Sequence, residues 1–209
     1  SGKGTLAALV AEQLGYHYLD SGALYRVTAH AAVLQGLGLD ASHETQIAAL
    51  ARQLPVRFEG DRVWLGTTDV TEEIRSETGG IRASLVSALP QVRLALVDLQ
   101  HRFARLPGLV ADGRDMGTVI FPDSPLKVFL TASAEARAQR RHQQVLQRGQ
   151  QADLAALLAD LQARDARDTQ RTAAPLKAAE DALLLDNTAL SIQASVDQLL
   201  DWWNRRWGD

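Results

Sequence analysis

Short apolar segments alternate with helical patterns along most of this 209-residue chain. The apolar segments lie at residues 16–19, 109–112, 126–130 and 182–185. Strands that alternate with helices form parallel sheets, because each helix carries the chain back to the edge where the next strand begins. A continuous apolar run is typical of a strand that is buried on both faces. We therefore predict an α/β fold, with a doubly wound parallel sheet and helices on both of its faces.

Hydrophobic spacing and capping residues predict where the helices lie. The first covers residues 5–14 and ends at Gly15, and the second follows a turn at 20–22 and ends at Gly36. Ser42 is the expected N-cap of a third helix, which Pro55 ends. Further helical patterns occupy residues 80–89, 92–103, 134–148 and 154–161, and a last one starts at Ser191.

One segment follows a different period. Val56 and Phe58, and then Val63 and Leu65, recur at every second position around a turn at 59–62. Alternation of this kind predicts a β-hairpin. Residues 56–70 therefore interrupt the succession of helices and strands, and we interpret them as part of a small insertion lobe.

Composition argues against several classes of protein. The net charge of −3 does not suit a dedicated binder of nucleic acid or of anionic membranes. No apolar run approaches the ~18 residues of a membrane-spanning helix, so no membrane partner is expected. The chain has no cysteine, which removes disulfides and thiolate metal sites and fits a cytoplasmic protein. The only methionine is Met116, and we expect the chain to begin inside a longer natural sequence.

The chain begins with Ser1-Gly2-Lys3-Gly4-Thr5, which matches the end of a phosphate-binding loop. In such a loop, backbone N–H groups and the positive end of a helix bind phosphates. Lys3 would reach the outer phosphates of a nucleotide, and the Thr5 hydroxyl would lie near Mg2+. The match alone can be a coincidence, because the first glycine of the pattern and the strand before it are absent from this sequence. For a molecule that starts at Ser1, we expect weak ATP binding and low stability.

Polar clusters follow the expected strands, where ligands of doubly wound sheets bind. Two of them lie at residues 20–26 and 112–115, and a third at 164–171 lies on or beside a helix. Asp112 precedes a glycine and is either a turn residue or a carboxylate that holds Mg2+ through water. Together with Lys3 and Thr5, the magnesium role is favoured.

Arginine is frequent at the same places. Phosphoryl transfer requires positioning and charge neutralisation, and the planar guanidinium group suits phosphate oxygens. The arginines in or beside the expected loops are Arg26, Arg114, Arg140, Arg141, Arg164 and Arg171. The basic helix at 134–148 either belongs to a mobile lid that closes over a nucleotide or is an exposed surface. The cluster at 164–171 likewise has the alternative of a solvated helix face with ion pairs.

Two longer strings are more specific than the phosphate loop. They are Asp20-Ser21-Gly22-Ala23-Leu24-Tyr25-Arg26 and Asp112-Gly113-Arg114-Asp115-Met116-Gly117-Thr118. With Lys3-Gly4-Thr5 and Arg164-Asp165-Ala166-Arg167-Asp168, they resemble the bacterial cytidylate kinases, in family order, from Ser1 to about Leu185. The resemblance implies a P-loop NTPase fold of the nucleoside monophosphate (NMP) kinase type. It implies one kinase domain over 1–209, with a core at 1–35 and 105–209, an NMP-binding insertion lobe at about 36–104 and a lid at about 141–153.

The resemblance also implies roles for individual residues. The residues that would hold ATP are Ser1, Gly2, Lys3, Gly4 and Thr5, with Arg140 and Arg141 from the lid. Mg2+ would be held by Thr5 and, through water, by Asp112. The residues that would bind CMP are Ser21, Arg26 and Arg114 at its phosphate, Ser84, Arg93 and Asp115 at cytosine, Arg164 and Asp168 at the sugar, and Arg171 near the phosphates. The catalytic group would be Lys3, Asp112, Arg114 and Arg171.

The expected reaction is ATP-dependent phosphorylation of CMP and dCMP, in pyrimidine nucleotide metabolism, by a monomer with no nucleic-acid partner. A carboxylate such as Asp115 accepts a hydrogen bond from the exocyclic amine of cytosine, whereas the carbonyl of uracil would be repelled. Two alternatives stay open. One is another small P-loop kinase that acts on UMP, AMP or a non-nucleotide acceptor, and the other is a catalytically silent nucleotide-binding module.

Overall fold

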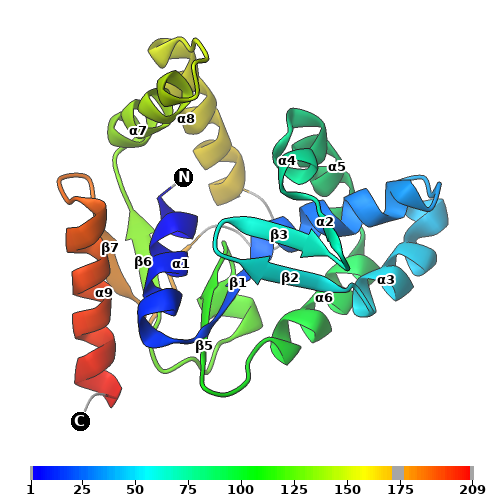
Figure 1. Cartoon of the computed structure of the whole chain (residues 1–209), viewed down its shortest axis with the longest axis horizontal. Helices are drawn as coiled ribbons and strands as arrows, with labels where there is room; N and C mark the ends of the chain where they lie inside the picture. Colours follow the sequence, from blue (N-terminus) through cyan, green and yellow to red (C-terminus); the bar gives the residue numbers. More distant parts are fainter. Residues whose placement is uncertain (1, 171–176, 208–209) are drawn as a thin grey trace. The chain divides into compact units, whose positions relative to one another are not determined.

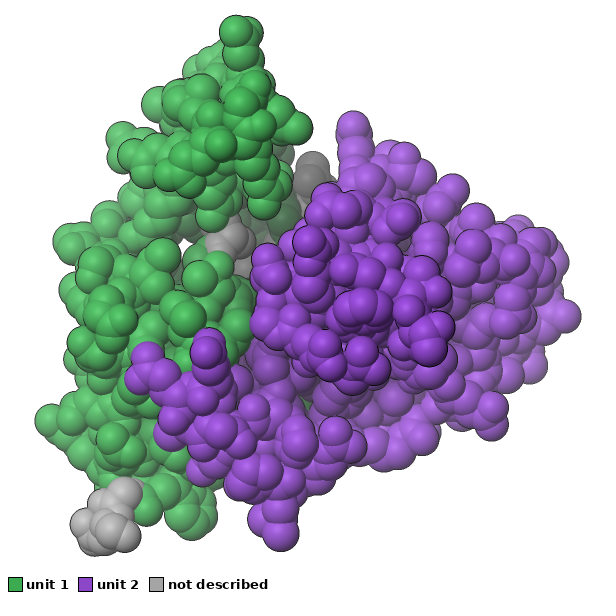
Figure 2. All heavy atoms as spheres, viewed as in Figure 1, with its two compact units in different colours: residues 1–10, 114–209 green, residues 11–113 purple. Residues whose placement is uncertain are grey.

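The computed structural model describes residues 2–170 and 177–207, with the backbone alone at 167–170. The chain divides into two compact units (Figure 2). One unit contains residues 1–10 and 114–209, and the other contains residues 11–113. Helix α1 (Lys3–Leu14) belongs to both, because the division falls after Val10.

In the unit of residues 11–113, strand β1 (His17–Asp20) pairs in parallel with β5 (Leu109–Asp112). The register sets His17 opposite Leu109 and Asp20 opposite Asp112. Both strands therefore end in a carboxylate at the same edge. Parallel pairing requires a long crossover, and here the chain between the two strands forms the rest of the unit (Figure 1).

Helices supply most of that crossover. They are α2 (Ser21–Leu34), α3 (Glu44–Arg52), α4 (Thr71–Arg75), α5 (Glu77–Ser87) and α6 (Pro90–Arg102), with a short 3₁₀ turn at Ala41–His43. Helix α2 packs against α5, and α3 packs against α6. Leu24 and Val27 on α2, Ile47 on α3, Val86 on α5 and Leu96 on α6 are fully buried. Apolar side chains of α2, α3, α5 and α6 therefore form the core of the unit, although Leu34, at the end of the predicted α2 stripe, is 68% exposed.

The predicted hairpin is confirmed and carries a third strand. Strands β2 (Val56–Glu59), β3 (Arg62–Leu65) and β4 (Thr68–Asp69) form an antiparallel sheet. Gly60 adopts a φ of 58° at the tip between β2 and β3, a left-handed conformation that glycine adopts without steric cost.

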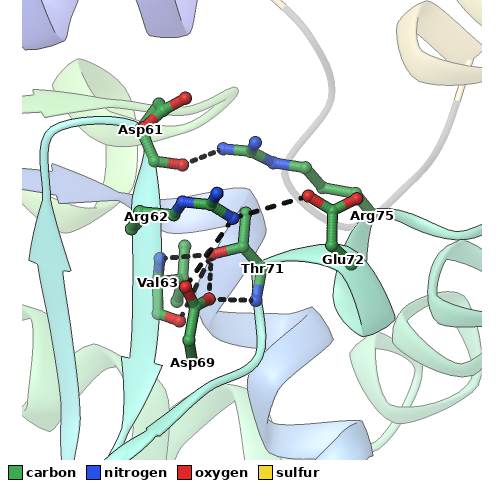
Figure 3. Close-up of polar contacts among 7 residues, drawn as sticks. All are labelled: Asp61, Arg62, Val63, Asp69, Thr71, Glu72 and Arg75. Atoms are coloured by element: carbon green, nitrogen blue, oxygen red, sulfur yellow. Dashed lines mark hydrogen bonds and ion pairs between the residues drawn. The ribbon is translucent and has the colours of Figure 1, made fainter.

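A buried hydroxyl joins this sheet to helix α4 (Figure 3). Thr71 is 1% exposed; its Oγ1 donates to Asp69 Oδ1 at 2.6 Å and accepts the Val63 N–H at 2.8 Å. Arg62 Nη1 lies 3.6 Å from Asp69 Oδ2 and 3.5 Å from Glu72 Oε1. These contacts fix the start of α4 against the middle strand of the sheet.

In the other unit, β6 (Val128–Thr131) pairs in parallel with β7 (Leu183–Asp186). Helices α7 (Ala134–Gln147) and α8 (Leu154–Gln170) pack side by side between them in the chain (Figure 1). Helix α9 (Ile192–Trp207) follows β7, and Ser191 Oγ accepts the Ala194 N–H at 3.0 Å at its start. A short π-helix, η2 (Met116–Ile120), precedes β6.

Several sequence expectations are corrected. The segment 20–22 is not a turn, because α2 begins at Ser21 directly after β1 with Asp20 as its N-cap. Ser42 does not cap α3, which has no side-chain cap. It lies in the 3₁₀ turn, where Asp40 Oδ1 accepts the Ser42 N–H at 3.0 Å and caps that turn. Helix α4 was not expected, and α5 begins at Glu77 rather than at residue 80.

The expectation that the apolar strands are buried on both faces is wrong for β7. Leu184 is 64% exposed, whereas its neighbour Leu185 is 5% exposed. Successive residues of a strand point to opposite faces, so one face of β7 is covered and the other is open. Parallel pairing is confirmed, but in the described residues it occurs in two sheets of two strands each. A single doubly wound sheet, and the division into core, insertion lobe and lid, stay predictions.

Among the described residues, no single helix is long and apolar enough to cross a membrane. Helices α5 and α6 meet the same criteria only as a pair, and they are bent by 102° at the break between them.

Candidate functional site

The start of α1 has the features of an anion site. The Gly2 carbonyl accepts the Leu6 N–H at 3.0 Å, so Lys3 to Thr5 form the first helical turn. The first N–H groups of a helix have no carbonyl partner within it and carry its positive end. The Lys3 and Thr5 side chains are exposed, and the buried Leu6 anchors the turn. The Lys3 ammonium and the Thr5 hydroxyl therefore lie on exposed side chains at the positive end of the helix, where a phosphate could bind.

The segment after β1 sets Arg26 against the corner between α4 and α5. Asp20 Oδ1 accepts the Ala23 N–H at 3.1 Å and caps α2, and Ser21 is buried in its first turn. Arg26 Nη1 donates to the Ile74 carbonyl at 2.6 Å and to the Ser76 carbonyl at 3.4 Å. The backbone therefore fixes the direction of the Arg26 side chain.

Arg93, on α6, lies against Tyr25 of α2. Its Cζ is 5.5 Å from the centroid of the Tyr25 ring, and its Nη1 donates to the Ser87 carbonyl at 3.3 Å. Ser84, on the last turns of α5, is exposed, and its carbonyl accepts the Ser87 hydroxyl at 2.9 Å. The predicted cytosine residues of this unit therefore lie around the α5–α6 junction.

Asp112 is a buried carboxylate at the end of β5, 8% exposed. The hydroxyl of Tyr18, on β1, donates to Asp112 Oδ2 at 2.6 Å. Burial raises the pKa of the Tyr18 phenol above its ordinary value, and the negative charge of Asp112 raises it further. Tyr18 thus stays protonated and serves as a donor to the carboxylate.

Arg114 and Asp115 continue the chain into η2. The Asp115 carbonyl accepts the N–H groups of Val119 at 2.9 Å and Ile120 at 3.1 Å, and the residue is 8% exposed. The half-buried Arg114 is one of the positive charges that lower the pKa of Asp165 on α8, after the larger effect of the hydrogen bonds from Arg137. Asp115 is therefore held by the backbone of η2, and Arg114 contributes positive charge beside α8.

Two arginines of α7, Arg137 and Arg140, are held by polar groups of the same unit. Arg137 forms a two-pronged ion pair with Asp165 on α8, with Nη1 donating to Oδ1 at 3.0 Å and Nη2 donating to Oδ2. The hydrogen bonds from Arg137 hold the pKa of Asp165 below its ordinary value. Arg140 donates to the Asn187 carbonyl at 2.6 Å and to Asn187 Oδ1 at 3.2 Å, which ties α7 to the segment after β7.

For the remaining predicted residues, the structure gives at most the helix on which each lies and, for two of them, its exposure. Arg141 is exposed on α7, and Arg164 is exposed on α8. Asp168 lies on α8, with its side chain outside the described residues. Ser1 and Arg171 lie outside the described residues altogether.

The oxygen donors of this chain suit Mg2+. In the part of the chain that the structure describes, no cluster of three or more histidine, cysteine or acidic side chains could hold a metal ion. Mg2+ keeps several waters and takes one or two protein oxygens together with substrate phosphates. A hydroxyl in the first turn of a helix, Thr5, and a buried carboxylate at a strand end, Asp112, are donors of that kind.

The sequence did not predict which residues form hydrogen bonds with the candidate site residues and with the arginines of α7. Tyr18 was assigned to an apolar strand, although a tyrosine hydroxyl in such a strand needs a polar partner. Asn187 is 5% exposed and accepts from Arg140. Its signal was the polar Asp186-Asn187-Thr188 string at the end of an apolar run. The Arg137–Asp165 pair joins two helices 28 residues apart, which no local pattern reveals.

Comparison with known proteins gives a consistent picture. The family model described as cytidylate kinase matches residues 1–205. A cytidylate kinase of Burkholderia vietnamiensis is 56% identical over 203 residues, which cover 97% of this chain and 88% of that protein. The cytidylate kinase of Cupriavidus necator is 54% identical over 97% of this chain and 90% of its own length. That of Chromobacterium violaceum is 52% identical over 99% of this chain and 92% of its own length.

Proposed function

This chain belongs to the cytidylate kinase family, and on that premise we propose that it phosphorylates CMP and dCMP with ATP. The γ-phosphoryl group passes from ATP to a phosphate oxygen of the acceptor, which gives ADP and CDP or dCDP. The observation that carries the proposal is identity above 50% over almost the whole chain, with the Asp20–Arg26 and Asp112–Thr118 strings inside the matched length.

The ATP phosphates are assigned to the first turn of α1. Ser1, Gly2 and Gly4 supply backbone N–H groups, and Lys3 neutralises the outer phosphates. Arg140 and Arg141 on α7 are assigned to the same nucleotide. The exposure of Lys3, Thr5 and Arg141 supports these assignments, because a ligand can reach their side chains. Mg2+, held through Thr5 and Asp112, supplies charge neutralisation at the phosphates when it is bound.

The acceptor is assigned to two arginines and a set of base-reading groups. Arg26 and Arg114, with Ser21 nearby, bind its phosphate. Ser84, Arg93 and Asp115 contact cytosine, while Arg164 and Asp168 contact the sugar and Arg171 approaches the phosphates. Support comes from the backbone contacts that fix Arg26 and the loop of Asp115 before any ligand binds. Preorganised donors stabilise developing charge without reorganisation.

The chain needs no general base for this reaction, because the attacking oxygen already belongs to an ionised phosphate. Its contribution is positioning and electrostatic stabilisation. Lys3, Arg114 and Arg171 neutralise charge on the transferred group. Asp115 discriminates against uracil, whose carbonyl would face a carboxylate.

The alternatives differ in substrate and in turnover. A kinase for UMP or AMP would release ADP with those acceptors and not with CMP, and a silent module would bind ATP without releasing ADP. A coupled ADP-release assay with CMP, dCMP, UMP and AMP decides among them. A role in pyrimidine nucleotide metabolism follows from this reaction, and we propose a cytoplasmic monomer.

A further inference from the structure

We propose that Tyr18 is a positioning residue that holds the Asp112 carboxylate for the magnesium–ATP complex. This inference rests on the proposed function, since that function assigns Asp112 to the metal. It adds a residue that acts through its hydrogen bond to Asp112.

The contact is short and lies within one unit. Tyr18 on β1 and Asp112 on β5 belong to neighbouring parallel strands, and the Tyr18 hydroxyl lies 2.6 Å from Asp112 Oδ2. An O–H donor at ~2.5–2.7 Å from a carboxylate oxygen has the length of a charge-assisted bond, which is about twice as strong as a neutral one. Asp112 is buried, so few waters are available to replace this donor.

The Tyr18 ring is itself held by an aromatic chain. Its centroid is 6.0 Å from that of Phe58 on β2, with an angle of 66° between the ring planes. Phe58 in turn lies 5.9 Å from Phe103, at the end of α6. The Tyr18–Phe58 pair is edge-to-face, a geometry that favours particular ring orientations, whereas the Phe58 and Phe103 rings are tilted by 49°. The hydroxyl is therefore aimed by packing from the β2–β4 sheet and from α6.

This arrangement predicts weaker metal binding when the Tyr18 hydroxyl is removed. A carboxylate with one donor fewer samples more orientations, so its hold on a metal-bound water weakens. Groups that orient a metal's ligands by hydrogen bonds typically contribute about 10–100-fold to metal affinity. Tyr18 should therefore affect metal binding while leaving the affinity for CMP unchanged.

The test is Tyr18→Phe in the full chain, with Mn2+ as the probe ion and ATP present. Mn2+ binding is read by electron paramagnetic resonance, which requires no turnover. We expect Tyr18→Phe to raise the dissociation constant of Mn2+ by about tenfold. The KM of the variant for CMP should match the wild-type value, because Tyr18 acts through Asp112 and not on the acceptor. Tyr16→Phe, which removes a hydroxyl two residues earlier, should leave Mn2+ binding unchanged.

A second variant covers the case in which Tyr18→Phe does not fold. Phe58→Leu keeps the Tyr18 hydroxyl but alters the ring packing, and it should weaken Mn2+ binding in the same direction and by less. Wild-type Mn2+ affinity in a folded Tyr18→Phe protein, or in Phe58→Leu if only that variant folds, would overturn the proposal. Absence of CMP turnover in the wild type would instead refute the proposed function. The two failures can be told apart, because Mn2+ binding is measured without turnover.

Discussion

The guanidinium of Arg26 donates to the carbonyl of Ile74 at 2.6 Å, across 48 residues of sequence. This bond joins α2 to the end of α4, where the Ser76 carbonyl also accepts from Arg26. Gly80 on α5 lies close to the Arg26 guanidinium. A Cβ added at residue 80 would lie 3.2 Å from Arg26 Nη2. The lack of a side chain at residue 80 therefore leaves room for the arginine that we assign to the CMP phosphate.

Gly80→Ala should weaken the binding of CMP and at the same time slightly stabilise the fold. Alanine favours a helix interior over glycine by about 0.5–1 kcal/mol, and the three atoms nearest to the added methyl group all belong to the Arg26 guanidinium, which is the end of a long side chain. We expect a small rise in thermal stability together with a higher KM for CMP and an unchanged KM for ATP. Steady-state kinetics and thermal melts measure both effects.

Gly79→Ala is the matched contrast to that variant. A Cβ at residue 79 would lie 2.4 Å from the Ile74 carbonyl oxygen, which is backbone and cannot move aside. Overpacking of this kind costs about 1–3 kcal/mol. A Gly79→Ala protein as stable as the wild type would contradict the described approach of α4 and α5.

Thr71→Val should destabilise the unit of residues 11–113. The valine has nearly the same shape as threonine but leaves the Val63 N–H without its acceptor, and an unsatisfied buried donor costs about 1–3 kcal/mol. Urea unfolding followed by tryptophan fluorescence measures the change, since Trp64 lies beside Val63 on β3. Thr71→Ser keeps the hydroxyl, so this variant should lose less stability than Thr71→Val. Equal losses in the two variants would assign the effect to packing rather than to the hydrogen bond.

The Arg137–Asp165 pair predicts a pH-dependent contribution to stability. The pKa of Asp165 is lowered in the folded protein, chiefly by its hydrogen bonds from Arg137. Its contribution is therefore present above the unfolded pKa of about 3.9 and is lost as pH falls through the folded value. Asp165→Asn should lower the melting temperature near neutral pH, and the difference from wild type should shrink below about pH 4.

Melting temperatures between pH 3 and 7 test this expectation. Asp160→Asn, on the exposed part of the same helix, serves as the control and should follow the wild type. A difference between Asp165→Asn and wild type that stays constant across this range would rule out the charge of Asp165 as its cause.

Arg114→Ala should act on the transition state more than on binding. Removing a group that stabilises developing charge typically lowers kcat by about 10²–10³-fold. Arg114→Lys keeps the charge without the planar fork and should recover part of the loss. Binding of ATP, measured by calorimetry, should stay within twofold of wild type. A kcat close to wild type in Arg114→Ala would remove this residue from the catalytic group.

Local patterns predicted most helices because their signals are local. Pro90 occupies the first turn of α6, and the Val92, Leu96 and Leu99 stripe is buried as its spacing indicates. Helix α4 escaped prediction because five residues are too few for a hydrophobic period. Ser42 was misassigned because a 3₁₀ turn capped by Asp40 precedes α3, and Ser42 lies inside that turn.

The candidate site was predictable only in its residue types. The strings at 20–26 and 112–118 identified Arg26, Asp112 and Asp115 through a family resemblance. The partners of these residues come from distant parts of the chain, as Tyr18 does for Asp112 and Ile74 for Arg26. Contacts over 48 and 94 residues depend on the assembled fold, and no period or cap in the sequence specifies them.

The most direct test of the proposed function is the kcat/KM of the purified chain for CMP relative to UMP, measured by coupled ADP release with ATP and Mg2+. A site that reads the cytosine amine through Asp115 should favour CMP by several orders of magnitude, as sites built around a buried hydrogen-bond partner do. We predict turnover with CMP and dCMP, and little with UMP or AMP. Turnover with UMP or AMP in the absence of turnover with CMP, or no turnover with any of the four, would contradict the assignment.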